Sequence, residues 1–311
     1  MPQTQGSYRC HVSRWWCDFS SPLMQPQNKC NARARIRPDA APARMLETPT
    51  VDPKEQMEFF YEMFDASLPR LGAGNEASTK KALDTMLAAM SQGKGEPILR
   101  PTRILDIGCG NGPQTIFLAK HLDRSILAVD NHPPFLEELK RRAATAGVGG
   151  KIQISLRDMR TLTKDDGPFD LIWSEGAIFV VGFREGLAAW RPLLAPGGGL
   201  AVSEIAWLRA DVPAECREFF AQVHPAMASV GDHLAAIEAC GYEILEHFVE
   251  PESAWWDGFY RPLESRLGTL RTRYAADAER LTMIEPIQNE IDIYRKHSAY
   301  YGNVFYLMRR R

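Results

Sequence analysis

The stretch RILDIGCGNGPQTIFLAKHLDRSILAVD, residues 103–130, decides the fold of this chain. It opens with an apolar run, Ile104 to Ile107, that is too short for a helix, and Gly108, Gly110 and Gly112 follow at once. Glycine adopts positive φ easily and lets backbone approach a ligand closely. We therefore expect a buried strand that ends in a ligand-binding turn.

The rest of the stretch predicts a helix and a second strand. Pro113 stands at the first helical position, where its missing N–H does no harm, and an apolar stripe continues to Leu122. Ser125 to Val129 predicts a second buried strand, with Asp130 at its carboxyl end. An acidic side chain there can accept hydrogen bonds from both hydroxyls of a ribose. The unit is expected to hold an adenosine.

Five residues of this unit carry a family resemblance. Asp106, Gly108, Gly110 and Gly112 match the signature D-x-G-x-G-x-G, and Asp130 matches the acidic residue that ends the second strand. The chain resembles the class I S-adenosylmethionine-dependent methyltransferases, of the small-molecule type with a core like methyltransferase domains 25 and 11. The resemblance implies S-adenosylmethionine as cofactor and an α/β, Rossmann-like fold. That fold is a seven-stranded, mostly parallel sheet with helices on both faces, here with a helical cap.

A nicotinamide cofactor fits this turn less well. Its binding loop requires G-x-G-x-x-G, whereas here the third glycine, Gly112, comes one position early and Pro113 follows it. The spacing therefore favours S-adenosylmethionine over a dinucleotide.

The resemblance extends to the ends of the next two strands. Ile152 to Leu156 predicts the third strand, and Asp158 and Met159 inherit contacts to the adenine by resemblance, although a solvated loop carboxylate is the alternative. Phe169 to Trp173 predicts the fourth strand, and Glu175 then lies at the ligand crevice beside the transferring methyl group. The predicted cofactor-binding residues are Asp106, Gly108, Cys109, Gly110, Gly112, Asp130, Asn131, Asp158, Met159, Ser174 and Glu175.

Three further strands complete the predicted sheet. The turn Pro196-Gly197-Gly198 precedes a fifth strand, Leu200 to Ser203, and is another landmark of the family. Glu243 to Val249 predicts a sixth strand, and Asn303 to Met308 predicts a closing, antiparallel strand.

Two helices precede the central unit. Pro53 to Phe64 has apolar and aromatic residues at helical spacing, and a turn-rich loop that contains Arg70 follows it. This helix either packs on the sheet or forms a lid over the cofactor. Ser78 or Thr79 is expected to cap the next helix, Lys80 to Met90.

A long insertion separates the last two strands. Pro251 to Tyr301 is rich in aromatic and charged residues, and we expect two helices in it, Pro262 to Ala278 and Leu281 to His297. With the N-terminal helix they would form a cap over an apolar pocket, although ordinary packing of a helical pair is the alternative. The predicted substrate-pocket residues are Arg70, Trp207, Trp256, Tyr260 and Tyr301.

Methyl transfer from a sulfonium is an in-line displacement that requires alignment, exclusion of water and, for some acceptors, a base. Glu175 is the predicted catalytic residue, as acceptor-positioning group or base, with binding of the cofactor's amino group as the alternative. His224, His233 and His297 are expected to be structural, and no ligand pattern predicts a metal site.

Charge is distributed unevenly along the chain: residues 1–44, the tail, are basic, and the remainder, the body, is acidic. Residues 1–44 contain seven basic and two acidic residues, which leaves thirty basic against thirty-seven acidic residues in the remainder. This tail is a targeting segment, a disordered tail or sequence ahead of a start at Met45, of which the third fits best. We expect N-terminal helices and lid at 45–92, the cofactor-binding core at 93–250, the cap at 251–301 and the closing strand at 302–311.

These features predict a methyltransferase that acts on a small molecule. The alternative is a catalytically silent, S-adenosylmethionine-binding regulatory or assembly protein. An acidic body argues against nucleic acid as partner, and no apolar run approaches the roughly 20 residues of a membrane span. We expect a cytoplasmic monomer or homodimer.

Overall fold

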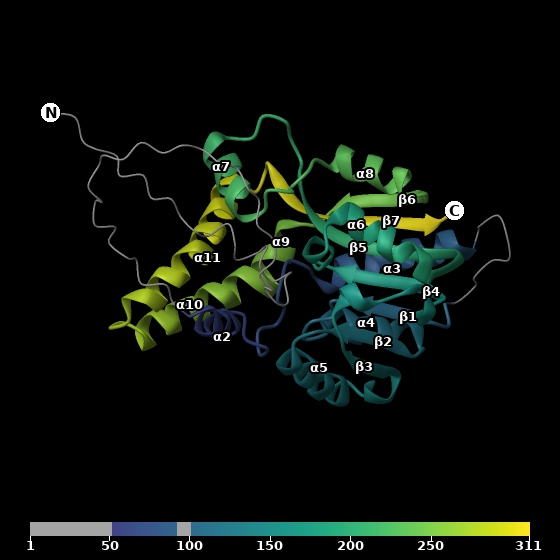
Figure 1. The fold of residues 1–311 in the computed structure, drawn as a ribbon, viewed down its shortest axis with the longest axis horizontal. Coiled ribbons are helices and arrows are strands. Elements are labelled where there is room, and N and C mark those ends of the chain that lie inside the picture. The colour runs from purple at the N-terminus through teal and green to yellow at the C-terminus, as the bar shows by residue number, and fades with distance from the viewer. Residues whose placement is uncertain (1–51, 92–100) are drawn as a thin grey trace, which may run out of the picture.

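A seven-stranded sheet forms the centre of the chain. In the computed structural model, which describes residues 52–91 and 101–311, the strand order is β3-β2-β1-β4-β5-β7-β6 (Figure 1). Six strands share one direction, and β7 runs antiparallel between β5 and β6. The strands are β1 Ile104–Ile107, β2 Ile126–Asp130, β3 Ile152–Leu156, β4 Phe169–Glu175, β5 Leu194–Trp207, β6 Tyr242–Val249 and β7 Tyr301–Arg310. The predicted fold class is confirmed, whereas the prediction for residues 1–44 lies outside the described residues.

Helices cover both faces of the sheet because its central strands are apolar on both sides. Helices α3 Glu76–Ser91, α4 Pro113–Leu122 and α5 Pro133–Thr145 cover one face. Helices α6 Phe183–Trp190 and α8 Val230–Ala239 cover the other. Along β4, Trp173 packs into the first layer and Ile172 into the second, as the alternation of a strand requires.

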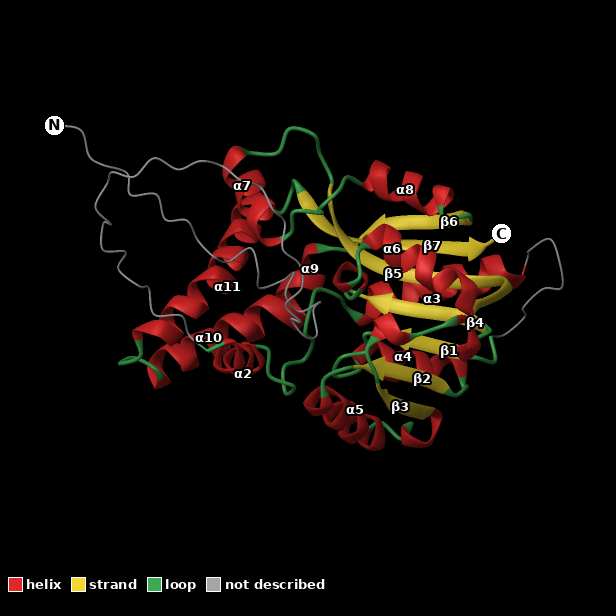
Figure 2. Cartoon of the chain, viewed as in Figure 1, coloured by secondary structure: helices red, strands yellow, loops and turns green. Residues whose placement is uncertain are grey.

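A helical cap lies beyond the carboxyl ends of the parallel strands, toward which the arrowheads of β1, β2 and β4 point (Figure 2). We use the term cap for α2 Pro53–Met63, α7 Ala214–Val223, α9 Glu252–Trp255, the π-helical turn Trp256–Tyr260, α10 Arg261–Arg273 and α11 Ala278–His297. These segments come from three distant parts of the sequence and share one apolar cluster. None of the helices in the described part of the chain is long and apolar enough to cross a membrane.

Three local predictions were wrong. The cap of α3 is Asn75, whose side chain accepts a hydrogen bond from the amide of Ser78 at 2.8 Å, so Ser78 and Thr79 lie inside the helix. Helix α7 was missed, although its buried residues, Cys216, Phe219, Phe220 and Val223, follow helical spacing. Strand β5 begins at Leu194, so the glycine turn before it is an irregular part of the strand that pairs with β4.

Candidate active site

A cavity of about 490 Å³ opens at the carboxyl ends of β1, β2 and β4. Eight of the predicted cofactor-binding residues line it: Gly108, Cys109, Gly110, Asp130, Asn131, Asp158, Met159 and Glu175. The opposite wall comes from α2 and the loop after it, and includes Phe60, Tyr61, Phe64, Arg70 and Leu71. The topology therefore brings the strand ends together under an aromatic wall.

The turn after β1 depends on glycine. Gly108 and Gly112 have φ of +70° and +84°, and a Cβ at these positions would lie 2.4 Å from Ala177 Cβ and 2.1 Å from Leu139 Cδ1, respectively. The amides of Gly108 and Cys109 both donate to the carbonyl of Val129. Gly108 thus lets the turn lie close to the cavity, whereas Gly112 lets α4 pack on α5 and lies outside the cavity lining.

Asp106 is buried beneath the turn and does not line the cavity. Its Oδ2 accepts hydrogen bonds from the hydroxyl of Thr115 at 2.5 Å and from Nε2 of Gln114 at 3.3 Å. Burial raises the pKa of Asp106 to about 7, although these two hydrogen bonds oppose the rise. Asp106 therefore fixes the start of α4 against β1.

Asp130 faces the cavity with both carboxylate oxygens fixed by backbone. Oδ2 accepts from the amide of Gly110 and Oδ1 from the amide of His132, each at 2.9 Å. Burial raises the pKa of Asp130, and these amides oppose the rise. Each oxygen keeps acceptor capacity for a ligand, because a carboxylate has about four lone-pair sites.

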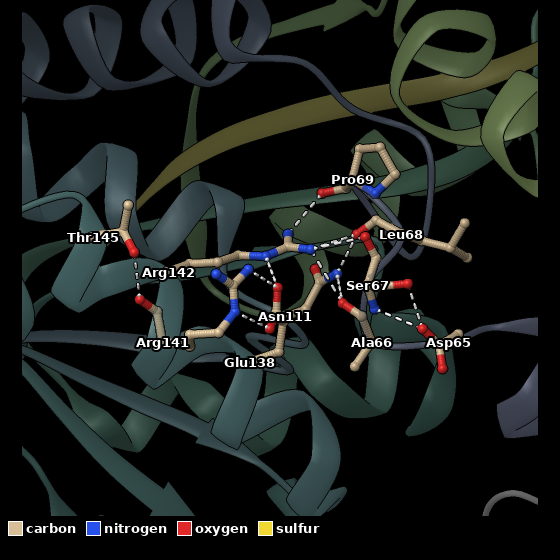
Figure 3. A network of polar contacts seen from close by, with 10 residues as sticks. All are labelled: Asp65, Ala66, Ser67, Leu68, Pro69, Asn111, Glu138, Arg141, Arg142 and Thr145. Carbon is tan, nitrogen blue, oxygen red and sulfur yellow. Dashed lines mark hydrogen bonds and ion pairs between the residues drawn. The ribbon is translucent and has the colours of Figure 1, made fainter.

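The loop after α2 is tied to the cofactor turn and to α5 (Figure 3). Arg142 of α5 donates to the carbonyls of residues 66, 67, 68 and 69 over 2.8–3.3 Å and to Glu138 at 2.7 Å. Asn111 Nδ2 donates to the carbonyls of Ala66 and Leu68 at 3.0 and 2.7 Å. These bonds hold the loop so that Arg70 and Leu71 form part of the cavity wall.

Glu175 ends β4 and is 3% exposed at its side chain. Its Oε1 accepts from the hydroxyl of Thr79 at 2.8 Å and from Nε1 of Trp173 at 2.9 Å. Its Oε2 pairs with Arg70 at 3.0 Å. Three donors therefore fix this carboxylate and join α3, β4 and the loop after α2.

Several predicted site residues lie elsewhere. The hydroxyl of Ser174 donates to the carbonyl of Ile107 at 2.9 Å inside the sheet, because alternation along β4 points it away from the cavity that Glu175 faces. Among the predicted substrate-pocket residues only Arg70 lines the cavity. Trp207, Trp256, Tyr260 and Tyr301 pack in or against the apolar cluster of the cap.

Several aromatic residues of the cavity wall were not predicted from the sequence. Phe60, Tyr61 and Phe64 line the cavity, and their helical spacing in an aromatic-rich helix was the available signal. Phe179, which follows β4 in a short 3₁₀-helix, also lines it and had no such signal.

Residues 104–198 match the model of a family described as a methyltransferase domain. Trans-aconitate 2-methyltransferase of Streptomyces avermitilis is 38% identical over 103 residues, which cover 32% of this chain and 38% of that protein. The Streptomyces coelicolor enzyme of the same name is 36% identical over 104 residues, with 33% and 34% coverage. The chain thus spans less than two fifths of the length of these curated relatives.

The fold is shared with solved structures. A methyltransferase of Geobacter sulfurreducens in complex with S-adenosylhomocysteine has a TM-score of 0.64 and 20% identity, and covers 86% of this chain and 100% of its own. A methyltransferase of Thiobacillus denitrificans, also in complex with S-adenosylhomocysteine, has a TM-score of 0.64 and 20% identity, and covers 81% of this chain and 98% of its own. The fold is of the Rossmann-like α/β kind. Within it, residues 104–198 match a methyltransferase domain and are similar to class I S-adenosylmethionine-dependent methyltransferases.

Proposed function

We propose that the chain transfers the methyl group of S-adenosylmethionine to a small-molecule acceptor. The observation that carries this proposal is the position of the glycine turn and of Asp130 on one cavity at the carboxyl ends of the strands. Strand ends of parallel sheets are where such folds bind nucleotides.

The described residues fit the cofactor. Because Gly108 has no Cβ, the turn can lie close against the cavity. Asp130 has acceptor capacity left for two ribose hydroxyls. Asp158 and Met159 line the part of the cavity assigned to the adenine, and the pair Arg70–Glu175 lies at the end assigned to the methionine.

When bound, the cofactor supplies an electrophilic methyl group on a positively charged sulfur. The chain's own residues then have to align the acceptor and exclude water. The aromatic wall of α2 covers the cavity and serves the second task. Glu175 serves as a positioning residue, because three donors already bind its carboxylate oxygens.

A small-molecule acceptor is supported by the covered cavity and by relatives named as methyltransferases of trans-aconitate. Thiols, amines, phenols and trans-aconitate itself form the panel to be tested. A cytoplasmic monomer or homodimer without a nucleic-acid partner stays a prediction.

The test is calorimetric titration of the full chain with S-adenosylhomocysteine, followed by detection of methyl transfer across the panel. Asp130→Ala is expected to weaken binding by about 1.5–3 kcal/mol, because it removes hydrogen bonds to a charged group. Asp165→Ala, which removes an exposed carboxylate outside the cavity lining, is the control. Unchanged affinity of Asp130→Ala would contradict the proposal. Binding without transfer to any acceptor would favour the silent cofactor-binding protein.

A further inference from the structure

Four polar side chains are buried without a hydrogen-bond partner where the sheet meets the cap. Glu204, Glu250, Trp255 and Tyr301 are 3%, 4%, 5% and 0% exposed. Within the described residues no partner reaches Glu204 Oε2, Glu250 Oε2, Trp255 Nε1 or Tyr301 Oη. A buried polar atom without a partner is destabilising. Four of them in one region therefore point to a ligand that the fold is built to receive.

Glu250, Trp255 and Tyr301 belong to one cluster with Tyr294, which we call the junction. The ring of Tyr301 contacts Trp255 edge-on at 6.2 Å and Tyr294 at 5.6 Å, and Trp255 stacks on Tyr294 at 4.5 Å. Glu250 Oε1 accepts a long hydrogen bond, 3.4 Å, from Asn303 Nδ2. The same amide donates to Ser203, the neighbour of Glu204 in β5, at 3.2 Å.

The junction adjoins the cavity wall at Gly176, which lines the cavity and donates its amide to Ser203 Oγ at 2.9 Å. The same hydroxyl accepts from Asn303 Nδ2, which also donates to Glu250. Burial raises the pKa of Glu250 to about 8, the charge of Glu175 adds to the rise, and Arg70 opposes it. Glu175 and Arg70 therefore lie close enough to Glu250 to act on its charge, and both line the cavity. An acceptor that passes this ion pair would reach Glu250.

The junction is rich in acid and in aromatic faces. Glu290 of α11 is half-buried, and its Oε1 accepts from the hydroxyl of Tyr260 at 3.0 Å. Among the described residues, Arg70 pairs with Glu175, and Nε2 of His224 lies 3.5 Å from Glu204 Oε1. Carboxylates together with the faces of Trp and Tyr are the chemistry that recognises an ammonium group. An anionic acceptor would meet like charge here.

We propose that the junction holds the acceptor and that the acceptor is an amine, so that the reaction is N-methylation. This inference rests on the proposed function and names its substrate class. Above the pKa of Glu250, where its carboxylate is ionised, a protonated amine first gives its proton to Glu250 Oε2, and at lower pH it gives the proton to water. The nitrogen lone pair then forms the new C–N bond as the C–S bond breaks, so the sulfonium becomes a neutral thioether and the product is an ammonium ion.

The first arm of the test uses the full chain saturated with S-adenosylhomocysteine. Choline and its neutral isostere 3,3-dimethylbutan-1-ol are titrated by calorimetry, and a panel of primary, secondary and tertiary amines is assayed for methyl transfer. We expect choline to bind at least tenfold more tightly than the isostere, and transfer to an amine. Equal binding, no binding by any amine, or transfer confined to thiols or phenols overturns the inference.

Variants connect the preference to the junction. Binding is measured above pH 8, where Glu250 is ionised, so that Glu250→Gln keeps the shape and removes the charge, whereas Tyr301→Phe removes only the hydroxyl. Glu250→Gln is expected to reduce the preference for choline at least fivefold. The control is Glu243→Gln near the start of β6, the strand that ends just before Glu250, and the carboxylate of Glu243 pairs with Arg309 at 2.6 Å. An unchanged preference in Glu250→Gln would contradict the inference.

The two proposals fail in different ways. If S-adenosylhomocysteine binds and choline shows no preference, N-methylation at the junction is wrong while the proposed function stands. If S-adenosylhomocysteine does not bind, the proposed function itself is wrong.

Discussion

The cofactor side of the cavity and the junction next to it are built in different ways. The cofactor side consists of short continuous stretches at the ends of β1, β2 and β3, and much of its geometry comes from backbone amides and from glycines with positive φ. The junction consists of side chains from α9, α11, β7 and the residue that follows β6, and Asn303 joins it to Ser203 of β5, a hundred residues away in the sequence. Local geometry thus defines the first side, and tertiary packing defines the second.

The largest expected effect tests the cofactor side. Gly108→Ala places an alanine in the left-handed backbone region, which costs about 1–2 kcal/mol. Its Cβ would also clash with Ala177, which costs about 1–3 kcal/mol more. We expect the affinity for S-adenosylhomocysteine, measured by calorimetry, to fall at least about 100-fold, which corresponds to about 2.7 kcal/mol.

The control for this change is Gly147→Ala. Gly147 has φ of +73°, similar to Gly108, but a Cβ there would meet nothing within 4 Å. This variant should lose about 1 kcal/mol of stability and keep its cofactor affinity. Equal affinities of the two variants would show that close approach at Gly108 is unimportant.

The second effect tests the tie between the loop and the cofactor turn. Arg142→Lys loses the planar donor set that reaches four carbonyls and Glu138, which we expect to cost about 2–3 kcal/mol of unfolding free energy. Cofactor affinity should fall with it, because Arg70 and Leu71 lose their position on the cavity wall.

Arg141→Lys is the matched control. Arg141 binds the same Glu138, but its side chain is 66% exposed, so its loss should cost less than about 0.5 kcal/mol in thermal or denaturant unfolding. If both variants unfold alike, the tie to the loop does not contribute to stability.

The third effect tests the junction through pH. Glu250 keeps its proton in the folded chain up to a pKa of about 8 because it is buried beside Glu175, whereas the unfolded chain loses it near 4.5. Between these two pH values the folded state binds more protons than the unfolded state. The contribution of Glu250 to the free energy of unfolding is therefore greatest below pH 4.5 and is lost as the pH rises through 8. Between pH 6 and 8 the loss should be about 2 kcal/mol, or about 4 °C of melting temperature.

Glu290 and Asp106 also contribute, because desolvation raises the pKa of each to about 7. Their contributions to stability are likewise lost as the pH rises. The contribution of Glu250 is therefore the difference between the wild type and Glu250→Gln, which should lose less stability over this range. Glu243→Gln should keep the wild-type slope, since that carboxylate is partly exposed. Identical slopes in all three chains would contradict the assignment.

The smallest effect tests helix α3, which positions Thr79 to donate its hydrogen bond to Glu175. Asn75→Ala removes the side-chain cap of α3 and should cost about 1 kcal/mol, measured by thermal unfolding. Asn75→Ser should restore most of it, because serine is also a strong cap. An alanine variant as stable as the serine variant would contradict the cap.

The sequence predicted much of the cofactor side and little of the junction. The apolar run before Gly108, the spacing of the glycines and Asp130 lie within one short segment, and each of these residues acts through local backbone geometry. Glu250, by contrast, is one glutamate in an acidic chain, and nothing in its neighbourhood marks it as buried. The aromatic residues of the insertion were recognised as a group, but the side on which each one packs was not.

The sequence by itself predicted the seven strands, the cofactor class and eight of the residues that line the cavity, because strand, turn and helix signals are local. Only the tertiary structure decided that Ser174 points into the sheet, that Arg142 and Asn111 fix the loop, and that Tyr301 packs beside Trp255 rather than on the cavity. These outcomes depend on which segments, distant in sequence, are pressed together when the apolar clusters of sheet and cap form. That choice is set by the burial of apolar surface over the whole chain.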